Sequence, residues 1–330
     1  MIRLLKNYQF ISLLLSVATL FAIGTFLWLL HAPVEPDKGE SPFSLWMNEG
    51  ILQLFGPDSF SGFVVLLVLV IIQSILFGAL AERTQLLYKN TWLPILFFGL
   101  FNLVFPEQLR FNPELLANVF LVLAVVSMFQ AQGKERALPA LLNSGILCGV
   151  SFLFAPSTFL FIPVFVIGIV MFKQVRALDI FQYLFGYFLV LFTGVTVTYL
   201  LGMQEVPAAY LRLPYLHTGT FKIWKNPNFA GMMALMALVL IPTLLRLQQN
   251  FYKNTIRVRK LQQFILLYFI FSLGYVVFGA QHIQTAIGIT ALPLSVYFTY
   301  YFLSDKRKWL RELVFLVLLM LVILQHWKPF

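Results

Sequence analysis

Acidic residues in segment 31–61 and basic residues in segment 203–226 could support chemistry together if the two segments meet. A carboxylate can act as a general base on a hydroxyl group, and arginine or lysine at a membrane surface can hold a lipid phosphate. Such a pairing would suit group transfer from a lipid-phosphate donor. The candidates are the acids Glu35, Asp37, Glu40, Glu49 and Asp58 and the bases Arg212, Lys222 and Lys225. The same residues also fit a simpler interpretation, as solvated loop charges and side chains anchored at the membrane surface.

The composition shows that a membrane must hold these segments in place. Of the 330 residues, 60% are hydrophobic and 11% are charged, and the mean hydropathy is +0.86. Soluble domains carry about 25% charged residues, and a soluble core cannot absorb so much apolar surface. We therefore predict an all-α fold, a polytopic transmembrane helical bundle that forms a single integral membrane domain over residues 1–330.

Apolar stretches separated by short charged loops predict about eleven spans. Stretch 92–105 is short for a full crossing. Stretches 138–155 and 157–172 are separated only by Pro156, so they fit either two spans or a re-entrant pair. The eleven stretches are 10–30, 62–81, 92–105, 113–131, 138–155, 157–172, 179–202, 227–245, 262–280, 285–303 and 310–326.

The distribution of basic residues predicts an orientation. With the N-terminus in the cytoplasm, 17 of the 23 Lys and Arg residues fall on the cytoplasmic side. This is the bias that cytoplasmic loops normally show, and eleven spans then place the C-terminus outside. Segments 31–61 and 203–226 become the long outer loops, and residues 43–55 could form a short interfacial helix in the first of them.

Several functional classes lose support from what the sequence lacks. The spans carry no Asp, Glu, Lys or Arg near their middles, which argues against an ion-coupled transporter or a pump. The chain contains no phosphate-binding loop and no His or Cys cluster with zinc spacing. We expect neither a metal nor a cofactor. The net charge is +10, and basic residues in the short loops of a membrane protein serve to set its topology. We therefore expect no nucleic-acid partner.

Polar and small residues within the spans suggest helix packing. For the amides Gln73, Asn102, Asn118, Asn143 and Gln182, hydrogen bonds between helices are the simplest interpretation. Gly145 and Gly149 lie four residues apart in a helix rich in small residues. We expect these glycines to allow close packing of two helices.

Two stretches resemble an uncharacterised bacterial integral-membrane family of unknown function. They are Asn112-Pro113-Glu114-Leu115-Leu116-Ala117-Asn118-Val119-Phe120-Leu121-Val122-Leu123-Ala124 and Gly149-Val150-Ser151-Phe152-Leu153-Phe154-Ala155-Pro156-Ser157 with its apolar continuation to Lys173. More distantly, the long acidic first outer loop and the short helices of region 92–172 are similar to those of GT-C glycosyltransferases. The sequence departs from that pattern because it has no clear paired-acid motif and no soluble C-terminal domain.

The resemblance implies a role in the bacterial inner membrane during cell-envelope biogenesis. GT-C enzymes use polyprenyl-phosphate-linked sugars at the outer leaflet. The resemblance makes Asp37 and Glu49 candidates for the catalytic acid, and Arg212 and Lys222 candidates for contact with the lipid phosphate. The alternative is a non-catalytic membrane subunit or scaffold that binds another membrane protein or a lipid, so catalysis itself stays open. A flippase is a weaker third interpretation because the spans lack charges at their middles.

Overall fold

The structure is a computed structural model, and the part of the chain that it describes is mainly helical. It describes residues 10–30, 41–55, 59–87, 89–133, 137–172, 176–200, 202, 205–212, 227–279, 283–304 and 308–327, which contain 13 α-helices and no strand. The α-helices are α2 (Phe10–Leu30), α3 (Pro42–Phe55), α4 (Phe60–Arg83), α5 (Leu93–Phe101), α6 (Pro113–Ala131), α7 (Leu138–Phe154), α8 (Ile162–Phe172), α9 (Ala177–Leu200), α10 (Glu205–Arg212), α11 (Pro227–Asn250), α12 (Ile256–Gly274), α13 (Ile283–Ser304) and α14 (Lys308–Trp327). Shorter helical turns are η1 (Pro106–Leu109), η2 (Pro156–Phe161), η4 (Phe251–Lys253) and η5 (Tyr275–Gly279).

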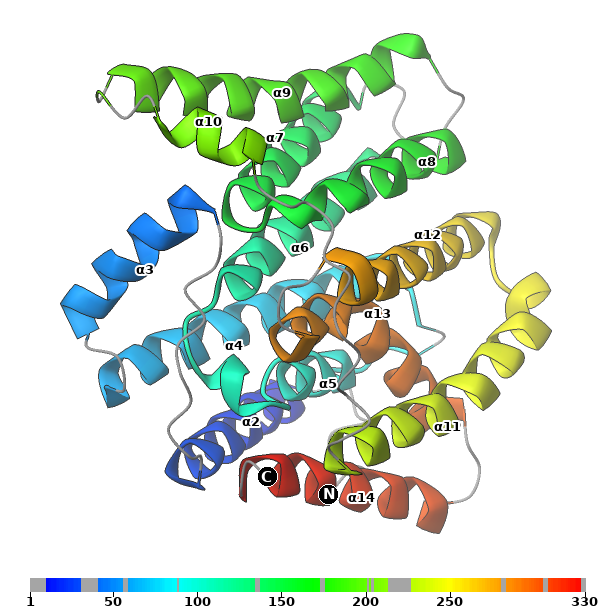
Figure 1. Cartoon of the computed structure of the whole chain (residues 1–330). Coiled ribbons are helices and arrows are strands. Elements are labelled where there is room, and N and C mark those ends of the chain that lie inside the picture. The colour runs from blue at the N-terminus through cyan, green and yellow to red at the C-terminus, as the bar shows by residue number, and fades with distance from the viewer. Residues whose placement is uncertain are drawn as a thin grey trace.

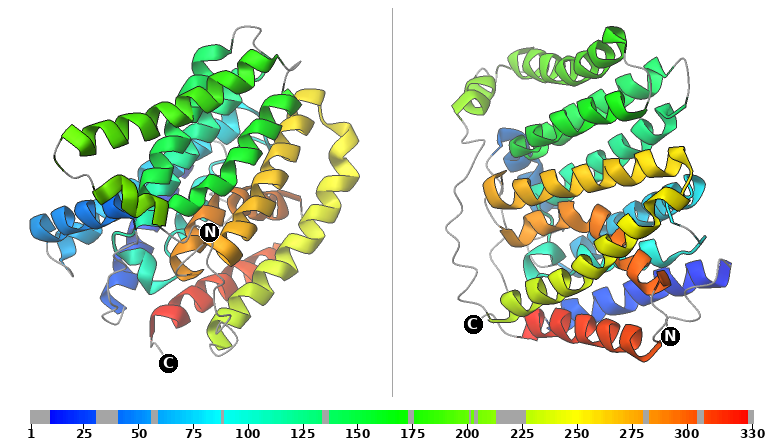
Figure 2. Two further views of the ribbon diagram at one scale, coloured as in Figure 1. Left: turned by 45° about the horizontal axis from the view of Figure 1, so that its top comes forward. Right: turned by 90° about the vertical axis from the view of Figure 1, so that its right-hand side faces the viewer.

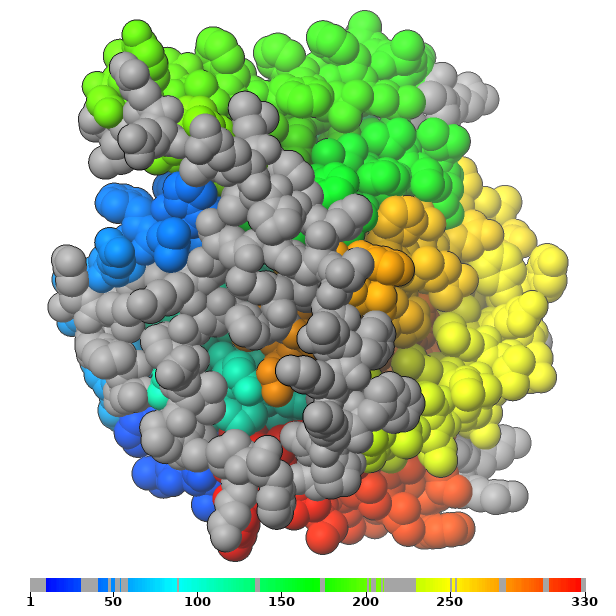
Figure 3. All heavy atoms as spheres, viewed as in Figure 1, coloured from blue at the N-terminus to red at the C-terminus, as the bar shows by residue number. Residues whose placement is uncertain are grey.

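The predicted helical membrane bundle is confirmed. Eight described helices are long and apolar enough to cross a membrane: α2, α4, α6, α9, α11, α12, α13 and α14. Three shorter apolar elements, α5, α7 and η2 with α8, coincide with the remaining predicted stretches. These elements lie side by side across one slab (Figure 2). In the space-filling view, α9 and α10 lie at one end of the molecule and α2 and α14 at the other (Figure 3).

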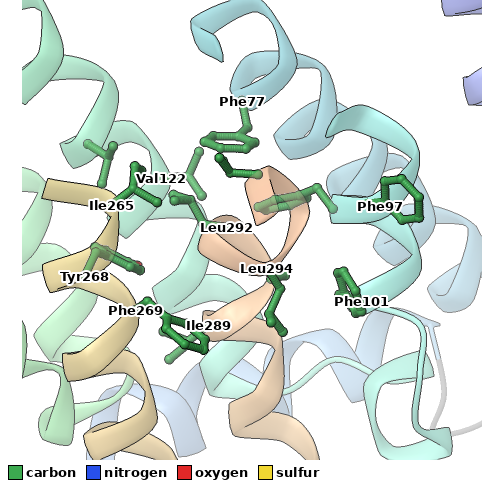
Figure 4. Close-up of a cluster of buried hydrophobic side chains, with 14 of the residues drawn as sticks. Phe77, Phe97, Phe101, Val122, Ile265, Tyr268, Phe269, Ile289, Leu292 and Leu294 are labelled. Atoms are coloured by element: carbon green, nitrogen blue, oxygen red, sulfur yellow. The ribbon is translucent and has the colours of Figure 1, made fainter. Parts of the chain in front are cut away.

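Helix α13 forms the centre of the bundle. The apolar part of α13 is wholly buried, whereas most of α2 and α9, at the edges of the bundle, is not buried by other helices. It packs against α5, α6, α11 and α12 (Figure 1). Leu292 of α13 lies in an apolar layer with Phe77 of α4 and Val122 of α6 (Figure 4). Phe77 in turn contacts Phe98 of α5, with 5.6 Å between the ring centroids. In this layer, apolar contacts therefore join α13 with three helices, α4, α5 and α6.

Close packing between α7 and α9 confirms the prediction made from the glycines. A Cβ atom at Gly145 would overlap the carbonyl oxygen of Tyr183, and one at Gly149 would lie 2.8 Å from that of Tyr187. On the facing side, a Cβ at Gly186 would lie 2.5 Å from the carbonyl oxygen of Leu142. Real Cβ atoms do not approach backbone oxygens so closely. The two helices can therefore reach this separation only with glycine at these positions.

The two short stretches around Pro156 have the arrangement of two crossings. Ala155, at the turn, packs with Ala117 near the beginning of α6. Phe172, at the end of α8, contacts Phe129 near the end of α6, with 5.9 Å between the ring centroids. The segment that follows the turn therefore extends over nearly the whole length of α6, which is itself a candidate span. This arrangement favours two short spans over a re-entrant pair.

Helices α3 and α10 lie at one face of the slab (Figure 2). Helix α3 confirms the short helix predicted within residues 43–55. The two helices contact each other although about 150 residues separate them in the sequence. We name this the α3–α10 face. That it is the outer face, with a cytoplasmic N-terminus, stays a prediction from the basic residues.

Candidate functional site

The C-terminal end of α7 holds the elements of both predicted outer loops. The last carbonyl groups of a helix have no partner within the helix. Here the hydroxyl of Ser41, at the start of α3, donates to the carbonyl oxygens of Leu153 at 2.9 Å and Phe154 at 3.1 Å. The hydroxyl of Tyr210, in α10, donates to the same Leu153 oxygen at 2.6 Å. One helix end therefore fixes the positions of α3 and α10 together.

Removing these two hydroxyl groups should loosen the α3–α10 face without unfolding the bundle. We expect Ser41→Ala and Tyr210→Phe each to cost about 1 kcal/mol, the usual net value of one hydrogen bond. Limited proteolysis should then cleave the loops that flank α3 and α10 faster than in the wild type. Thr196→Ala is the matched control, because its hydroxyl donates within α9 itself, to the carbonyl oxygen of Phe192 at 2.8 Å. Equal cleavage rates in all variants would show that the caps do not hold the two helices.

Two of the four candidate site residues lie on these two helices. Glu49 is on α3 and is exposed, and Arg212 is the last residue of α10. The contact between α3 and α10 brings the elements that carry Glu49 and Arg212 together. Asp37 and Lys222 lie outside the described residues. Their proposed roles therefore stay predictions.

A second charged group at this face was not selected from the sequence. Segment 106–114 contains Glu107 and Arg110, which are half-buried, and Glu114, whose exposed fraction is 7%. We name these three residues the polar rim. The segment is ordered locally, because the side-chain oxygen of Asn112 accepts from the Leu115 amide at 2.7 Å and caps α6. Glu114 consequently lies in the first turn of α6, where the helix dipole favours a negative charge.

Three buried amide side chains accompany the polar rim: Asn102 and Asn118 lie between spans, and Gln108 lies on η1. Asn118, one turn after Glu114 on α6, donates to the carbonyl oxygen of Gly288 at 3.1 Å and to the side-chain oxygen of Asn102 at 3.4 Å. Asn102 donates to the carbonyl oxygen of Phe98 at 2.9 Å, and Gln108 accepts from the Phe105 amide at 3.1 Å. The expected hydrogen bonding between helices is therefore confirmed for Asn102 and Asn118. Asn143, in contrast, is exposed at the surface of α7.

Sequence reasoning missed the polar rim because charge alone does not show burial. The available signal was the density of polar residues in Pro106-Glu107-Gln108-Leu109-Arg110-Phe111-Asn112-Pro113-Glu114, between two apolar stretches. Among the described residues, no three His, Cys, Asp or Glu side chains lie together as a potential metal site.

Comparison with known proteins identifies one matching family and two solved structures with a similar fold. The family of unknown function DUF6427 matches residues 42–328. No curated protein matches by sequence. The solved structure of the oligosaccharyltransferase from Archaeoglobus fulgidus, tethered to an acceptor peptide, is 10% identical, with a TM-score of 0.50 over 98% of this chain and 52% of that chain. ArnT from Cupriavidus metallidurans, in the apo state, is 14% identical, with a TM-score of 0.51 over 86% of this chain and 59% of that chain.

Because the sequence identities are low, these two similarities show a shared fold and nothing beyond it. The chain spans between 52% and 59% of the length of these two proteins. Both neighbours are GT-C membrane proteins, so the distant similarity predicted from the sequence is confirmed at the level of the fold. Because the family match covers most of the chain, the protein belongs to DUF6427, a family of unknown function.

Proposed function

We propose that this protein transfers a sugar from a polyprenyl-phosphate carrier to a hydroxyl acceptor at the outer leaflet of the bacterial inner membrane. The GT-C-like fold supports this class of reaction. The names of the two neighbours, one an oligosaccharyltransferase, are consistent with it. Cell-envelope biogenesis is the process in which such a transfer would serve.

One observation carries the proposal: the carboxylate of Glu114 is almost buried at the α3–α10 face. Ionisable side chains buried within a membrane bundle are rare, and they mark candidate functional sites. Glu107 and Arg110 belong to the same short segment, so acidic and basic groups occur together there. The polar rim therefore supplies both kinds of group that the reaction requires.

The chemistry needs a base and a cationic site for the phosphate. In the proposed step, the acceptor oxygen attacks the anomeric carbon of the sugar and its proton passes to a carboxylate. The bond from that carbon to the phosphate oxygen breaks, and the polyprenyl phosphate leaves with the electron pair. We propose Glu114 as the base, with Asp37 and Glu49 as the other candidates. Arg110, Arg212 and Lys222 are proposed to hold the leaving phosphate.

The test is a transfer assay with the full chain in lipid vesicles. Polyprenyl-phosphate glucose serves as donor, a bacterial membrane lipid and glycan extract supplies hydroxyl acceptors, and released polyprenyl phosphate is measured. We expect release by the wild type and a large loss in at least one of Asp37→Asn, Glu49→Gln and Glu114→Gln. Release no faster than from protein-free vesicles, or equal release by the wild type and all three variants, would refute the proposal.

A non-catalytic membrane subunit is the second candidate, and the lipid-facing surface of α9 favours it. Phe181, Phe185, Phe188 and Phe192 follow helical spacing along one face, and all four are exposed. Aromatic residues of this kind are common at protein interfaces. This function predicts that another membrane protein co-purifies with the wild type and is lost when Phe185 and Phe192 are both changed to Leu. A transfer activity retained by that double variant would support the enzyme instead.

A further inference from the structure

Beneath the polar rim, four helices contribute polar groups at one depth of the membrane. The apolar layer contains Phe77, Phe98, Val122 and Leu292. One helical turn closer to the α3–α10 face, each helix carries a polar group instead: Gln73 on α4, Asn102 at the end of α5, Asn118 on α6, and the Gly288 backbone on α13. We name these four positions, with Gln108 of η1, the amide layer.

The helix register supports the position of Gln73 in this layer. Val70 of α4 clusters with Leu115 of α6. Gln73 and Asn118 each lie three residues further along, and both helices begin toward the α3–α10 face. On the other side of α4, Phe77 contacts Phe98 of α5. Two independent helix contacts therefore place Gln73 level with Asn102 and Asn118.

Backbone groups fix the orientation of two of these amides, and this determines which of their atoms are left over. The Phe105 amide requires the side-chain oxygen of Gln108, so the Gln108 Nε2 group faces away from it. The Gly288 carbonyl requires the Nδ2 group of Asn118, which leaves Asn118 Oδ1 on the other side. Exchanging the nitrogen and oxygen of either amide would break these bonds. The leftover atoms are therefore defined by chemistry.

These leftover atoms have no hydrogen-bond partner among the described residues. They are Gln108 Nε2, Asn118 Oδ1 and both amide atoms of Gln73. The exposed fraction is 1% for Gln73, 3% for Gln108 and 0% for Asn118. Leaving one buried polar group unsatisfied costs about 1–3 kcal/mol, and native proteins rarely keep several together. The layer therefore calls for a further group that supplies hydrogen bonds.

Gly288 keeps the region open to such a group. A Cβ atom there would lie 3.0 Å from Asn102 Oδ1 and 3.5 Å from Gln108 Nε2. An acceptor and a donor thus face the same point beside the α13 backbone. An alanine there would press on Asn102 Oδ1 and would touch Gln108 Nε2 at an ordinary contact distance, so the glycine leaves the most room between these two atoms.

The leftover atoms also define the chemistry of the missing group. Two are donors and two are acceptors, and the layer itself carries no charged side chain. An anion would meet the acceptors unfavourably, a cation would meet the donors, and an apolar group would satisfy none. A neutral group that both donates and accepts hydrogen bonds suits this mixture. Water can donate two and accept two hydrogen bonds, and a hydroxyl group can donate one and accept two, so an O–H group of either kind fits the layer.

We propose that the amide layer binds a hydroxyl group, supplied either by the sugar of a lipid-linked saccharide or by ordered water. The sugar source rests on the proposed function, whereas the water source does not. Glu114 lies one turn above Asn118 on α6, at a rise of about 6 Å. A sugar bound in the layer would consequently lie directly below the proposed base.

Binding to the full chain in lipid nanodiscs distinguishes the two sources without requiring turnover. Polyprenyl-phosphate glucose and polyprenyl phosphate are compared as probes, and a high-resolution structure of the unliganded protein is examined for ordered oxygen. If the sugar is the source, the wild type should prefer the glucose-bearing lipid. Gln73→Leu and Asn118→Leu should then reduce that preference about tenfold, and the affinity for polyprenyl phosphate should stay unchanged.

Asn143→Leu is the matched control, because it removes the same kind of amide from an exposed position in a span. If Asn118→Leu does not fold, Gln73→Leu still tests the proposal. Among the described residues the Gln73 amide makes no hydrogen bond, so this substitution removes none. Ordered oxygen at the leftover atoms without a sugar preference would assign water as the source. If the experiments found neither ordered oxygen at the leftover atoms nor a preference for the glucose-bearing lipid, the proposal would be overturned. Sugar binding in a protein that shows no transfer would refute the proposed function alone.

Discussion

Gly145→Ala should destabilise the protein strongly, although alanine normally favours a helix. The new Cβ atom would overlap the backbone carbonyl oxygen of Tyr183, which belongs to a helix and cannot rotate away as a side chain could. Helices α7 and α9 would have to separate along their whole contact. Overpacking in well-packed interiors costs about 1–3 kcal/mol and occasionally more, and we expect the upper end here. The temperature at which the purified protein aggregates in detergent should fall accordingly.

Gly194→Ala provides a control of opposite sign on the same helix pair. A Cβ atom at Gly194 would lie 3.7 Å from a methyl group of Leu153, which is an ordinary contact distance. Replacing glycine by alanine within a helix gains up to about 1 kcal/mol from backbone entropy alone. We therefore expect Gly194→Ala to be neutral or stabilising. If both variants aggregated at the wild-type temperature, α7 and α9 would not be as close as described.

Glu114→Gln should abolish most of the proposed transfer activity while the fold is retained. Glutamine has nearly the same shape and can still accept hydrogen bonds, but it cannot take up a proton at neutral pH. General base catalysis contributes about 10²–10⁴-fold to a rate, so the initial rate of polyprenyl phosphate release should fall at least 100-fold. The variant should elute from size-exclusion chromatography like the wild type.

Glu312→Gln is the matched control, because Glu312 is an exposed carboxylate on α14. Its rate should equal that of the wild type. An unchanged rate in Glu114→Gln would assign Glu114 a structural role at the start of α6. The proposed base would then be Asp37 or Glu49, which the same assay examines. Loss of elution as a single species would instead show that the charge of Glu114 is needed for folding.

Hydropathy was sufficient to predict the spans because the bilayer imposes one requirement on every segment that crosses it. A backbone in lipid must satisfy its own hydrogen bonds, so an apolar stretch such as Phe60–Arg83 has no alternative to a helix. The close contact at Gly145 was predictable for a similar reason, since small residues four apart have few other uses in a span.

The site was less predictable because it depends on contacts between distant segments. Nothing local to Glu114 indicates that it is buried, whereas Glu49, which the loop length favoured, is exposed. Likewise, Ser41 and Tyr210 show no sequence signal for their shared acceptor on Leu153. The position of Gln73 level with Asn118 follows only from the register of α4 against α5 and α6.

The central position of α13 has a consequence for the biogenesis of the protein. Nine apolar helical segments precede α13 in the described part of the chain, and its mean hydropathy of 1.4 is the lowest of the eight long candidate spans found there. The nine earlier segments therefore enter the bilayer before the helix that they will surround has been synthesised. Insertion and assembly must be separate stages, as the packing of membrane helices generally allows. If synthesis stopped before residue 283, the earlier helices would be inserted but would lack α13, the helix around which they pack. We expect such a truncated chain to be a substrate for membrane quality control.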